Sequence, residues 1–574
     1  MPAAPLPAEP EPLAPAARRA WLLILALGAA LFGLRLAAPA DLTDNDQERP
    51  ASYVLDAVQN NHWLIQRDAY DDIASKPPLL TWLAGLAAWI AGRLSRFTLY
   101  LPCATAIVGA ALLIQAGAGA RFGTLAGLLG ALSLLFSQYG FKHVVLARND
   151  ALFAFTVSLA ALAAFRAWMT GRGWTWFWLA AAAATLTKGP LGVLLGAGGL
   201  LAVAWERRAT EPLGLRGRIW PGALVWLTLV GGWFALAWLS AGDDLIRKQL
   251  GRELAGHLTG AEAGGKPPFS DPFHTALYFL SRYAPWSLAA CVGFWRVWRR
   301  PAANAAERRF ERFLFCWFAL GLLVFTLAPH KRPDLLLPII PAAAMLAGRE
   351  LAGGLGRFHP KHVWLGVTLG SVALLGVLAV ARPQGRDTAG EVVTTRAMRE
   401  LAEWWEQSGP HNPPLTFVEH TLTVQFYLNR HQLVITPAQA ARLLLGDAAC
   451  VLVTRDLAAV RRHLPADFAL RVLHAAPAGG EPRGWLVTHQ HEPTETNSAT
   501  AVGVGPLQVR LDGAAFVQAR RFALVLRRTR PEARVEVVNE SDRPVTVRVY
   551  WTDKPGPYVE RRLVAAERWV LESR

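Results

Sequence analysis

The sequence predicts a polytopic α-helical membrane protein with a soluble C-terminal domain, and three observations support this prediction. Of the 574 residues, 53% are hydrophobic and 23 are tryptophan. Repeated apolar runs lie between residues 20 and 381, most of them near the ~20 residues that a helix needs to cross a ~30 Å hydrocarbon core. Residues 382–574 contain no such run. We therefore expect a membrane domain followed by a soluble domain.

The chain starts with a Pro- and Ala-rich stretch, residues 1–19, which we expect to be a disordered cytoplasmic tail. The first apolar run could mimic a signal peptide, but its length and the many later runs predict a retained first helix. The apolar runs of the membrane domain, residues 20–381, predict about eleven spans, at 20–39, 98–117, 123–139, 150–168, 174–187, 190–205, 219–240, 275–295, 312–328, 334–350 and 362–381.

Basic residues in short loops set the expected orientation, because such loops stay in the cytoplasm. With a cytoplasmic N-terminus, the eleven spans place three basic loops inside and residues 382–574 in the periplasm of a bacterial inner membrane. The net charge of +16 is thereby explained by topology rather than by nucleic-acid binding. The three loops contain Arg207, Arg208, Arg216 and Arg218; Arg299, Arg300, Arg308 and Arg309; and Arg349, Arg357 and Lys361.

One short apolar run, Leu79–Ile90, follows Pro77 and Pro78. If it crossed the membrane, the basic loops would face the periplasm, so we expect a helix that lies at the membrane interface. The loop over residues 40–97 is then wholly periplasmic.

The soluble domain, residues 382–574, divides by pattern into two parts. Helix-like and strand-like segments alternate over 382–489, which predicts an α/β unit. After a linker over 490–505, residues 505–574 read as strands of a β-rich module. No catalytic cluster stands out in either part, so we expect this periplasmic domain to cap the active site or to bind the acceptor.

With this topology, unusual polar residues gather on the periplasmic side. A carboxylate or a cation near the membrane surface can hold a lipid phosphate or serve as a base. Most polar residues of the predicted periplasmic loops could equally be solvated or form local ion pairs. The candidates are Asp44, Asp46 and Lys76 in the first loop, Arg148 and Asp150 at the start of a span, Lys188 in a Lys-Gly-Pro turn, and Lys331, Arg332 and Asp334 in a later turn.

The loop over residues 241–274 adds further candidates for substrate contacts. Arg252, His257, His274 and Tyr278 lie in or beside it, and its cations on the outer face indicate an anionic ligand. The two histidines could bind a divalent metal, but no third ligand is evident, so a metal stays an open alternative. The four cysteines have no CxxC spacing, so we expect neither a structural disulfide nor a cysteine metal site.

Several motifs together resemble the lipid A aminoarabinose transferases, which belong to the membrane glycosyltransferases of the GT-C fold; protein O-mannosyltransferases are more distant relatives. The resemblance covers residues 20–350, and the order of the motifs is more specific than any one of them. They are DNDQERPASYVLDAV, SKPPLLTW, ARNDALF, TKGPLG, PFHTALYFLSRYAPWS and HKRPDLLLPIIPA.

The resemblance implies roles for individual residues. Asp46, with Arg49 three residues later, falls on the family's active-site Asp…Arg pair, and Asp150, with Arg148, falls on the second active-site aspartate. Lys76 falls on the lysine that contacts the carrier phosphate. Lys188 and Lys331 fall on further lysine positions in periplasmic turns, and the family also has juxtamembrane helices in the first loop.

This sequence departs from the family pattern at three positions. Ser75 stands where the family usually has Glu, which puts in doubt any metal or acceptor contact of that carboxylate. Pro50 stands where Tyr is common, and Arg332 stands where an aromatic residue often follows the lysine. These changes indicate a paralogue whose acceptor or sugar can differ from lipid A and aminoarabinose.

The resulting hypothesis is a glycosyltransferase that moves a sugar from a polyprenyl-phosphate donor to a lipid A, glycan or protein acceptor, with inversion. No cofactor is certain and no nucleic acid is expected as a partner. Two alternatives are also compatible with the spans and the anionic-lipid features: a lipid-linked sugar transporter or flippase, and a glycan polymerase or ligase. A transporter predicts internal repeats with broken helices near the midplane, which the sequence does not show.

Overall fold

The computed structural model describes residues 15–37, 42, 45–207, 213–249, 272–329, 331–381, 389–409, 415–445, 450–478, 481–489, 498–511, 517–527, 534–540, 545–551 and 559–572. By contacts the chain forms two compact units. The helical unit consists of Met1–Ala38, Ser75–Leu80 and Tyr100–Pro383. The mixed unit consists of Pro39–Ala74, Thr81–Leu99 and Gln384–Arg574. Of the expected tail, residues 1–19, the first 14 residues lie outside the described residues.

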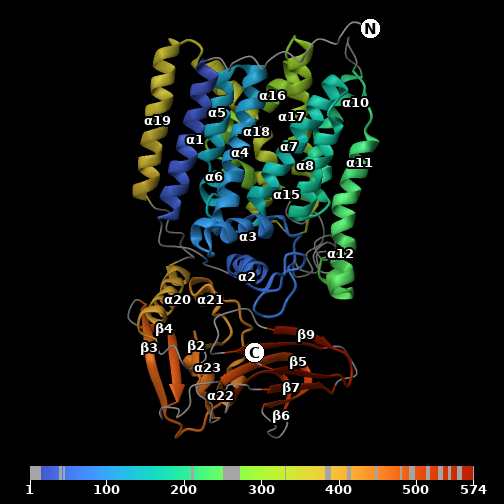
Figure 1. The fold of residues 1–574 in the computed structure, drawn as a ribbon. Helices are drawn as coiled ribbons and strands as arrows, with labels where there is room; N and C mark the ends of the chain where they lie inside the picture. Colours follow the sequence, from blue (N-terminus) through green and yellow to red (C-terminus); the bar gives the residue numbers. More distant parts are fainter. Residues whose placement is uncertain are drawn as a thin grey trace. The chain divides into compact units, whose positions relative to one another are not determined.

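The helical unit is a bundle of apolar helices (Figure 1). Its elements are α1 (Pro15–Leu36), α4 (Arg96–Phe122), α5 (Thr124–Leu135), α6 (Gln138–His143), α7 (Asn149–Thr170), α8 (Trp174–Lys188), α9 (Leu191–Ala197), η1 (Gly198–Leu201), α10 (Ala202–Glu206), α11 (Trp220–Trp226), η2 (Leu227–Gly231), α12 (Gly232–Ala241), α13 (Asp243–Leu245), α15 (Pro272–Arg282), α16 (Trp286–Arg299), α17 (Ala305–Leu327), η5 (Pro333–Ile339), α18 (Ile340–Leu355) and α19 (Pro360–Ala381).

Seven helices of the described residues are long and apolar enough to cross a membrane. They match seven of the eleven predicted spans, which confirms a polytopic helical membrane protein. The other four predicted spans correspond to shorter helices: α5, α8, the run from α9 to α10, and the pair α15 and α16. The number of spans therefore stays a prediction.

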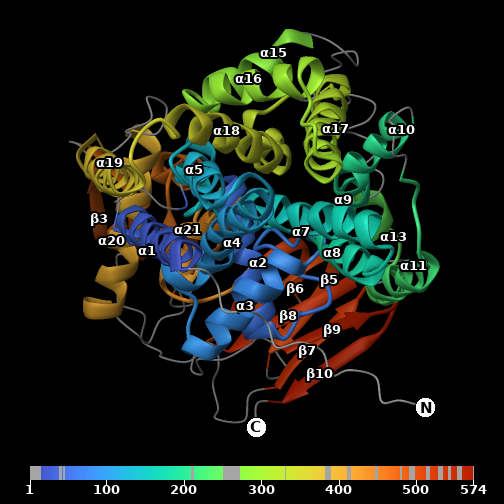
Figure 2. The same ribbon diagram turned by 90° about the horizontal axis from the view of Figure 1, so that it is seen from above.

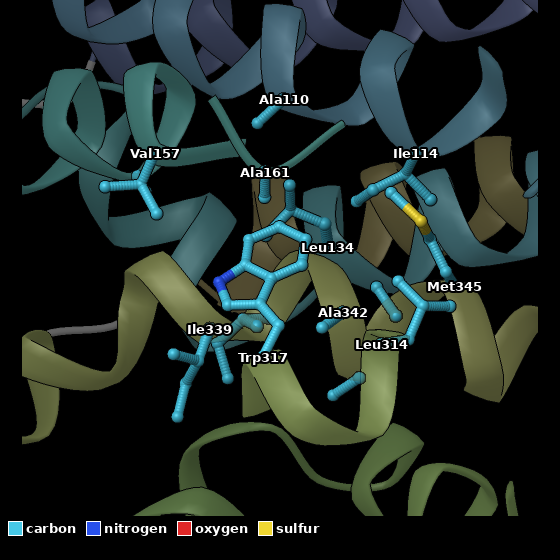
Figure 3. Packing of buried hydrophobic residues seen from close by; sticks show 14 of the residues in the cluster. Ala110, Ile114, Leu134, Val157, Ala161, Leu314, Trp317, Ile339, Ala342 and Met345 are labelled. Atoms are coloured by element: carbon cyan, nitrogen blue, oxygen red, sulfur yellow. The ribbon is translucent and has the colours of Figure 1, made fainter. Parts of the chain in front are cut away.

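The core of the helical unit forms where α17 packs against its neighbours (Figure 3). Trp317 of α17 is fully buried, together with Ile339 of η5 and Met345 of α18. Small residues such as Ala161 and Ala342 surround this indole, because large residues on every helix would keep the helices apart. The polar residues described below lie at helix ends rather than in this core.

Helices α5 and α18 pack closely because both have small residues where they meet. A Cβ atom on Gly348 would lie 2.2 Å from the carbonyl oxygen of Ala126 and 2.6 Å from the nitrogen of Gly130. A Cβ atom on Gly130 would lie 2.7 Å from the carbonyl oxygen of Ala344. Backbone atoms cannot yield as a flexible side chain can, so glycine is required at both positions.

Replacing Gly348 with Val is therefore expected to separate α5 from α18 and to lower the thermal stability of the purified protein. Forcing atoms into a well-packed core costs about 1–3 kcal/mol or more. Gly353→Val is the matched control on the same helix, because a Cβ atom there meets nothing within 4 Å. Equal melting temperatures for the two variants in detergent would contradict the close packing.

The mixed unit contains two sheets and the helices around them (Figure 1). The first sheet has the order β1-β2-β4-β3, with β1 parallel to β2 and the other pairs antiparallel. The second sheet has the order β10-β7-β5-β8-β9, and β6 pairs with β5. The elements are α2 (Asn45–Asn60), α3 (Leu79–Ala91), α20 (Ala389–Ser408), β1 (Leu415–Phe417), α21 (Leu422–Tyr427), α22 (Pro437–Leu445), β2 (Val451–Thr454), α23 (Leu457–Arg461), β3 (Leu470–Ala478), β4 (Glu481–His489), β5 (Ser498–Leu511), β6 (Val517–Arg527), β7 (Arg534–Asn539), β8 (Val545–Trp551), β9 (Val559–Leu563) and β10 (Arg568–Glu572).

Two features of the mixed unit differ from the expectations based on sequence. Strand β5 begins at Ser498, inside the segment interpreted as a linker over 490–505. Most of the first loop, residues 40–97, belongs by contacts to the unit that contains the C-terminal residues, not to the helical unit. Residues 45–60 of that loop form the helix α2, and the short apolar run forms α3 as expected, although its place at a membrane interface stays a prediction.

Hydrogen bonds attach the first loop to the C-terminal residues of the mixed unit. The backbone N–H of Val434 donates to the carbonyl of Ala69 over 2.8 Å. The N–H of His420 donates to the hydroxyl of Tyr70 over 2.9 Å. The buried Glu48 of α2 accepts from the hydroxyl of Thr423. Since these contacts join positions more than 340 residues apart, no local pattern could have predicted them.

Candidate active site

A charged cluster lies at one set of helix ends in the helical unit. Helix α6 ends at His143, α7 begins at Asn149, α8 ends at Lys188 and η5 begins at Pro333. These four ends bring together side chains from positions 142 to 334. We call Lys142, Arg148, Asp150, Lys188 and Asp334 the helix-end cluster.

Asp334 is the centre of one half of the helix-end cluster. Its two carboxylate oxygens accept from the Nζ atom of Lys142 over 2.9 and 2.6 Å. Arg148 donates from Nη1 to the same carboxylate over 3.4 Å. The Nε2 atom of buried His143 lies 3.6 Å from it. One carboxylate therefore holds two cations in fixed positions.

Asp150 and Lys188 form the other half, as a close ion pair. Asp150 is in the first turn of α7, where the positive end of the helix dipole favours a carboxylate. Lys188 is in the last turn of α8, where a cation is favoured for the same reason. The side chain of Asn149 also donates to the carbonyl of Thr187 over 2.7 Å, so the two helix ends are joined twice.

The helix-end cluster has three cations and two carboxylates, all partly shielded from solvent. It therefore carries a net positive charge beside the N-terminus of the long helix α7. A helix N-terminus combined with cations is an arrangement that binds phosphate groups. The cluster can thus accept a phosphate ester, and each carboxylate fixes the geometry of the cations around it.

Arg148, Asp150 and Lys188 were predicted as site residues from the sequence, and the structure brings these three together with Asp334. No role was predicted for Lys142 or His143. The only feature that could have indicated a role for Lys142 is its position directly after an apolar run, in GFKHVV. A lysine at that position is equally typical of an ordinary helix end. The ion pair with Asp334 depends on tertiary structure and could not be read from the sequence.

Two other predicted lysines of the helical unit have different surroundings. The carbonyl of Lys76 accepts from the side chain of Gln249 over 3.5 Å, just before α3. The Nζ atom of Lys331 donates to the carbonyls of Thr326 and Ala328, at 3.0 Å each, and so closes the end of α17. Arg332 is exposed at the start of η5.

Arg49 belongs to the mixed unit and pairs there with two aspartates. Its guanidinium lies 3.3 Å from Asp68 and 3.8 Å from Asp72. Asp46 lies in α2, and nothing is described of its side chain. Arg49 is still partly exposed, so a phosphate can compete with these carboxylates for it.

The remaining candidates are only partly described. Asp44, Arg252 and His257 lie outside the described residues. His274 and Tyr278 lie one turn apart on α15, with ring centroids 6.1 Å apart. Among the described residues, no three His, Cys, Asp or Glu side chains are grouped to hold a metal. Since His257 is outside that set, the metal alternative stays untested.

The stability of the mixed unit is expected to depend on pH through Asp68, whose side chain is fully buried. Burial raises the pKa of Asp68 from 3.8 to about 6, although Arg49 and two backbone N–H groups act to lower it. A raised folded pKa means that stability is present below pH 4 and is lost as the pH rises to 6, by about 3 kcal/mol. Asp68→Asn should remove this pH-dependent loss of stability. Hydrogen exchange of the amides of α2 at pH 4.5 and at pH 7 measures the stability. If the variant loses as much stability between these pH values as the wild type, Asp68 is not the group responsible.

Comparison with known proteins finds similarity to the two groups of transferases that the sequence motifs resemble. The profile of the dolichyl-phosphate-mannose-protein mannosyltransferase family matches residues 75–240. An undecaprenyl phosphate-α-4-amino-4-deoxy-L-arabinose arabinosyl transferase of Erwinia tasmaniensis is 28% identical over 217 residues, 37% of each chain. A transferase of the same name from Pseudomonas fluorescens is 30% identical over 217 residues, 36% of this chain and 35% of its own. The match thus spans little more than a third of these relatives.

The fold agrees over a much larger part of the chain. The crystal structure of ArnT from Cupriavidus metallidurans bound to undecaprenyl phosphate has a TM-score of 0.59 to this structure, at 17% identity. The match covers 81% of this chain and 97% of ArnT. At this identity the similarity shows the fold alone. The chain therefore has the GT-C fold and resembles the aminoarabinose transferases.

Proposed function

We propose that this protein is a membrane glycosyltransferase that takes its sugar from a polyprenyl-phosphate donor. The observation that carries the proposal is the helix-end cluster, in which Lys142, Arg148 and Lys188 surround Asp150 and Asp334 on a GT-C fold. The names of the relatives give the donor class, an undecaprenyl phosphate-linked aminoarabinose. The acceptor is a lipid A, glycan or protein group.

The cluster suits the chemistry of this transfer. As the bond between sugar and phosphate breaks, the leaving phosphate gains negative charge, and fixed cations stabilise that charge in the transition state. The two carboxylates keep the cations in place before the substrate arrives, so little reorganisation is needed. On the strength of the resemblance, we propose Lys76 and Arg49 as ligands of the donor phosphate. We propose that Lys331 shapes the turn before Asp334.

Asp46 is the proposed catalytic carboxylate, on the strength of the resemblance. It would deprotonate or orient the acceptor hydroxyl, which attacks the sugar carbon from the side opposite the phosphate. The new glycosidic bond then forms as the bond to the phosphate breaks, and the configuration inverts. If the acceptor is a phosphate, it is already ionised, and Asp46 would act by positioning it.

We also propose that the helix-end cluster faces the periplasm of a bacterial inner membrane. The support is that the basic loops around Arg207, Arg299 and Arg357 lie at the other helix ends, where the positive-inside rule places the cytoplasm. The charges of the cluster lie at helix ends rather than in mid-span. This arrangement favours a transferase over the alternative of a flippase, which needs polar groups along its path.

The test is mass spectrometry of envelope lipids and glycans from cells that make the wild-type protein or Asp46→Asn. We expect one envelope species to lack a sugar in the variant, with carrier-linked sugar accumulating. Asp71→Asn, in the same loop, is the control and should behave as wild type. Identical profiles at equal membrane levels of all three proteins would reject the proposed reaction.

A further inference from the structure

A fully buried histidine lies beside the helix-end cluster, and the proposed reaction does not use it. His143 is the last residue of α6, and none of its surface is exposed. Helix α6 follows α5, which packs against α18 (Figure 2), and η5 leads directly into α18. This packing brings Asp334 of η5 beside the end of α6, so the imidazole of His143 and the carboxylate of Asp334 face each other.

A hydrogen bond at one ring nitrogen determines which nitrogen of His143 carries a proton. The Nδ1 atom lies 2.8 Å from the carbonyl oxygen of Tyr139. A carbonyl oxygen only accepts, so Nδ1 donates, and in the neutral ring Nε2 then presents a lone pair. Nε2 lies 3.6 Å from the Oδ1 atom of Asp334, which is beyond hydrogen-bond distance. The neutral ring therefore points an acceptor at a carboxylate.

Lys142 holds the negative charge that the neutral ring faces. Its Nζ atom donates to both carboxylate oxygens of Asp334, over 2.9 and 2.6 Å. The side chain of Lys142 is 41% exposed, whereas those of Lys188 and Arg148 are 20% and 17% exposed. Lys142 is therefore the cation of the helix-end cluster that can most easily turn toward a bound phosphate. That movement would take from Asp334 its principal partner, because Arg148 lies 3.4 Å away.

The charge of His143 depends on the groups around it. Burial lowers the pKa of His143 below its ordinary 6.5, although Asp334 and Asp150 act to raise it, so the ring is neutral at pH 7. Helix α5, which packs against α6, has no charged residue. The charged and titratable groups that face α6 or its partners among the described residues include Lys142 and Tyr139 of α6, Arg148 and Asp150 of α7, Asp334 of η5, Lys188 of α8, Cys103 of α4, Arg35 of α1 and Arg282 of α15.

We propose that His143 takes up a proton from solvent when the donor phosphate binds, and that its imidazolium then replaces Lys142 as the partner of Asp334. This inference rests on the proposed function, because it is the donor phosphate that draws Lys142 away. The second proton binds Nε2, so the ring donates to Asp334 while Nδ1 continues to donate to Tyr139. The gap of 3.6 Å has to shorten by less than about 1 Å to reach an ordinary hydrogen-bond length. His143 is thus a positioning residue, which keeps Asp334 in place as Lys142 turns to the phosphate.

Proton uptake by His143 makes donor binding weaker as the pH rises. Linkage requires that the affinity falls by up to about tenfold per pH unit where one proton is taken up for each ligand bound. Histidine is the side chain whose charge ordinarily changes near neutral pH, unlike lysine, arginine and aspartate. A pH-dependent affinity in this range therefore reports on a histidine, provided that the charge of the ligand stays constant.

Isothermal titration calorimetry of the purified full chain tests this, in buffers of different ionisation enthalpy and with undecaprenyl methyl phosphate as the ligand. This phosphodiester keeps one negative charge near neutral pH, so any proton taken up belongs to the protein. The wild type should take up roughly one proton per ligand, and its affinity should fall roughly three- to tenfold per pH unit around pH 7. His143→Gln, whose amide can donate to Asp334 without titrating, should bind with no proton uptake. His362→Gln, an exposed histidine of α19, is the control and should behave as wild type.

The outcomes separate this inference from the proposed function. Binding by the wild type without proton uptake, or equal uptake by His143→Gln, overturns the role of His143 and leaves the proposed function standing. If the wild type does not bind the phosphodiester at all, both are rejected.

A variant at Lys142 keeps the test decisive if His143→Gln folds poorly. Lys142→Met removes the cation that the imidazolium is proposed to replace, so His143 should already be charged at pH 7 before any ligand is added. NMR of the ¹³C-labelled histidine measures its pKa in the full chain, which should rise by about one unit or more relative to wild type. Arg282→Gln is the control, because it removes a cation that contacts Gln138 of the same helix and should leave the pKa of His143 unchanged. Equal pKa values of His143 in the wild type and in Lys142→Met would overturn the exchange of partners.

Discussion

Replacing Lys188 with Met is expected to lower the rate of sugar transfer by about 100- to 1,000-fold. Lys188 ends α8, its Nζ atom pairs with Asp150, and a donor phosphate bound at the N-terminus of α7 would share that cation. Removing one fixed charge that stabilises a developing anion costs enzymes a factor of this size. The measurement is transfer from carrier-linked sugar by the purified protein, with kcat and KM determined separately.

A double variant separates this role from a purely structural one. Lys188→Met alone leaves Asp150 as a buried carboxylate without its partner, and such a charge can destabilise a protein by about 3–5 kcal/mol. Asp150→Asn/Lys188→Met leaves no unmatched charge and should recover the stability. If it also recovers transfer, the pair only supports the fold. If it folds and stays inactive, the pair acts on the substrate.

The second large effect is expected at Asp56, which joins the first loop to the C-terminal residues of the mixed unit. Its buried carboxylate accepts from His62 over 3.0 Å, from Asn60 over 2.8 Å and from the backbone N–H of Arg67 over 2.8 Å. His431 lies 3.7 Å away. Asp56→Ala removes all these contacts and should destabilise the mixed unit by about 3 kcal/mol.

Hydrogen exchange of the full-length protein measures this effect, since amides of α2 and of residues 429–434 should lose protection together. Glu403→Ala is the control, because its ion pair with Arg399 is exposed and should contribute under 1 kcal/mol.

The stability that Asp56 supplies also depends on pH. Burial acts to raise the pKa of Asp56, but His431 and His62 outweigh it and hold the pKa well below 3.8. This stability is therefore present above pH 4 and lost below it.

The sequence predicted the helical membrane domain well because apolar runs of this length seldom form anything but membrane-spanning helices. Seven long helices match predicted spans. The short helices α5 and α8 were harder to interpret, since a run of 12 or 15 residues can end inside a bundle whose neighbours cover it. Arg148, Asp150 and Lys188 were found because charged residues beside apolar runs are conspicuous.

What the sequence could not reveal were partnerships between distant residues. Lys142 looks like any lysine after a helix until Asp334, 192 positions later, is placed beside it. The partners of Arg49 were equally hidden, because Asp68 and Asp72 are two of several acidic residues in the first loop and nothing in the sequence distinguishes them. The three arginines around Glu206 likewise come together only when α17 is packed against α10.

The discontinuous path of the mixed unit has a consequence for biosynthesis. Residues 45–74 are made early, yet the hydrogen-bond partners of Glu48 and Tyr70 are Thr423 and His420, and His431 lies beside Asp56. At about 5–20 residues per second, the ribosome needs roughly 20–70 seconds to produce the intervening chain. During that interval the nascent first loop has its polar groups exposed and its helix α2 without tertiary support. A chaperone that holds this segment open would therefore act before the last helices are inserted.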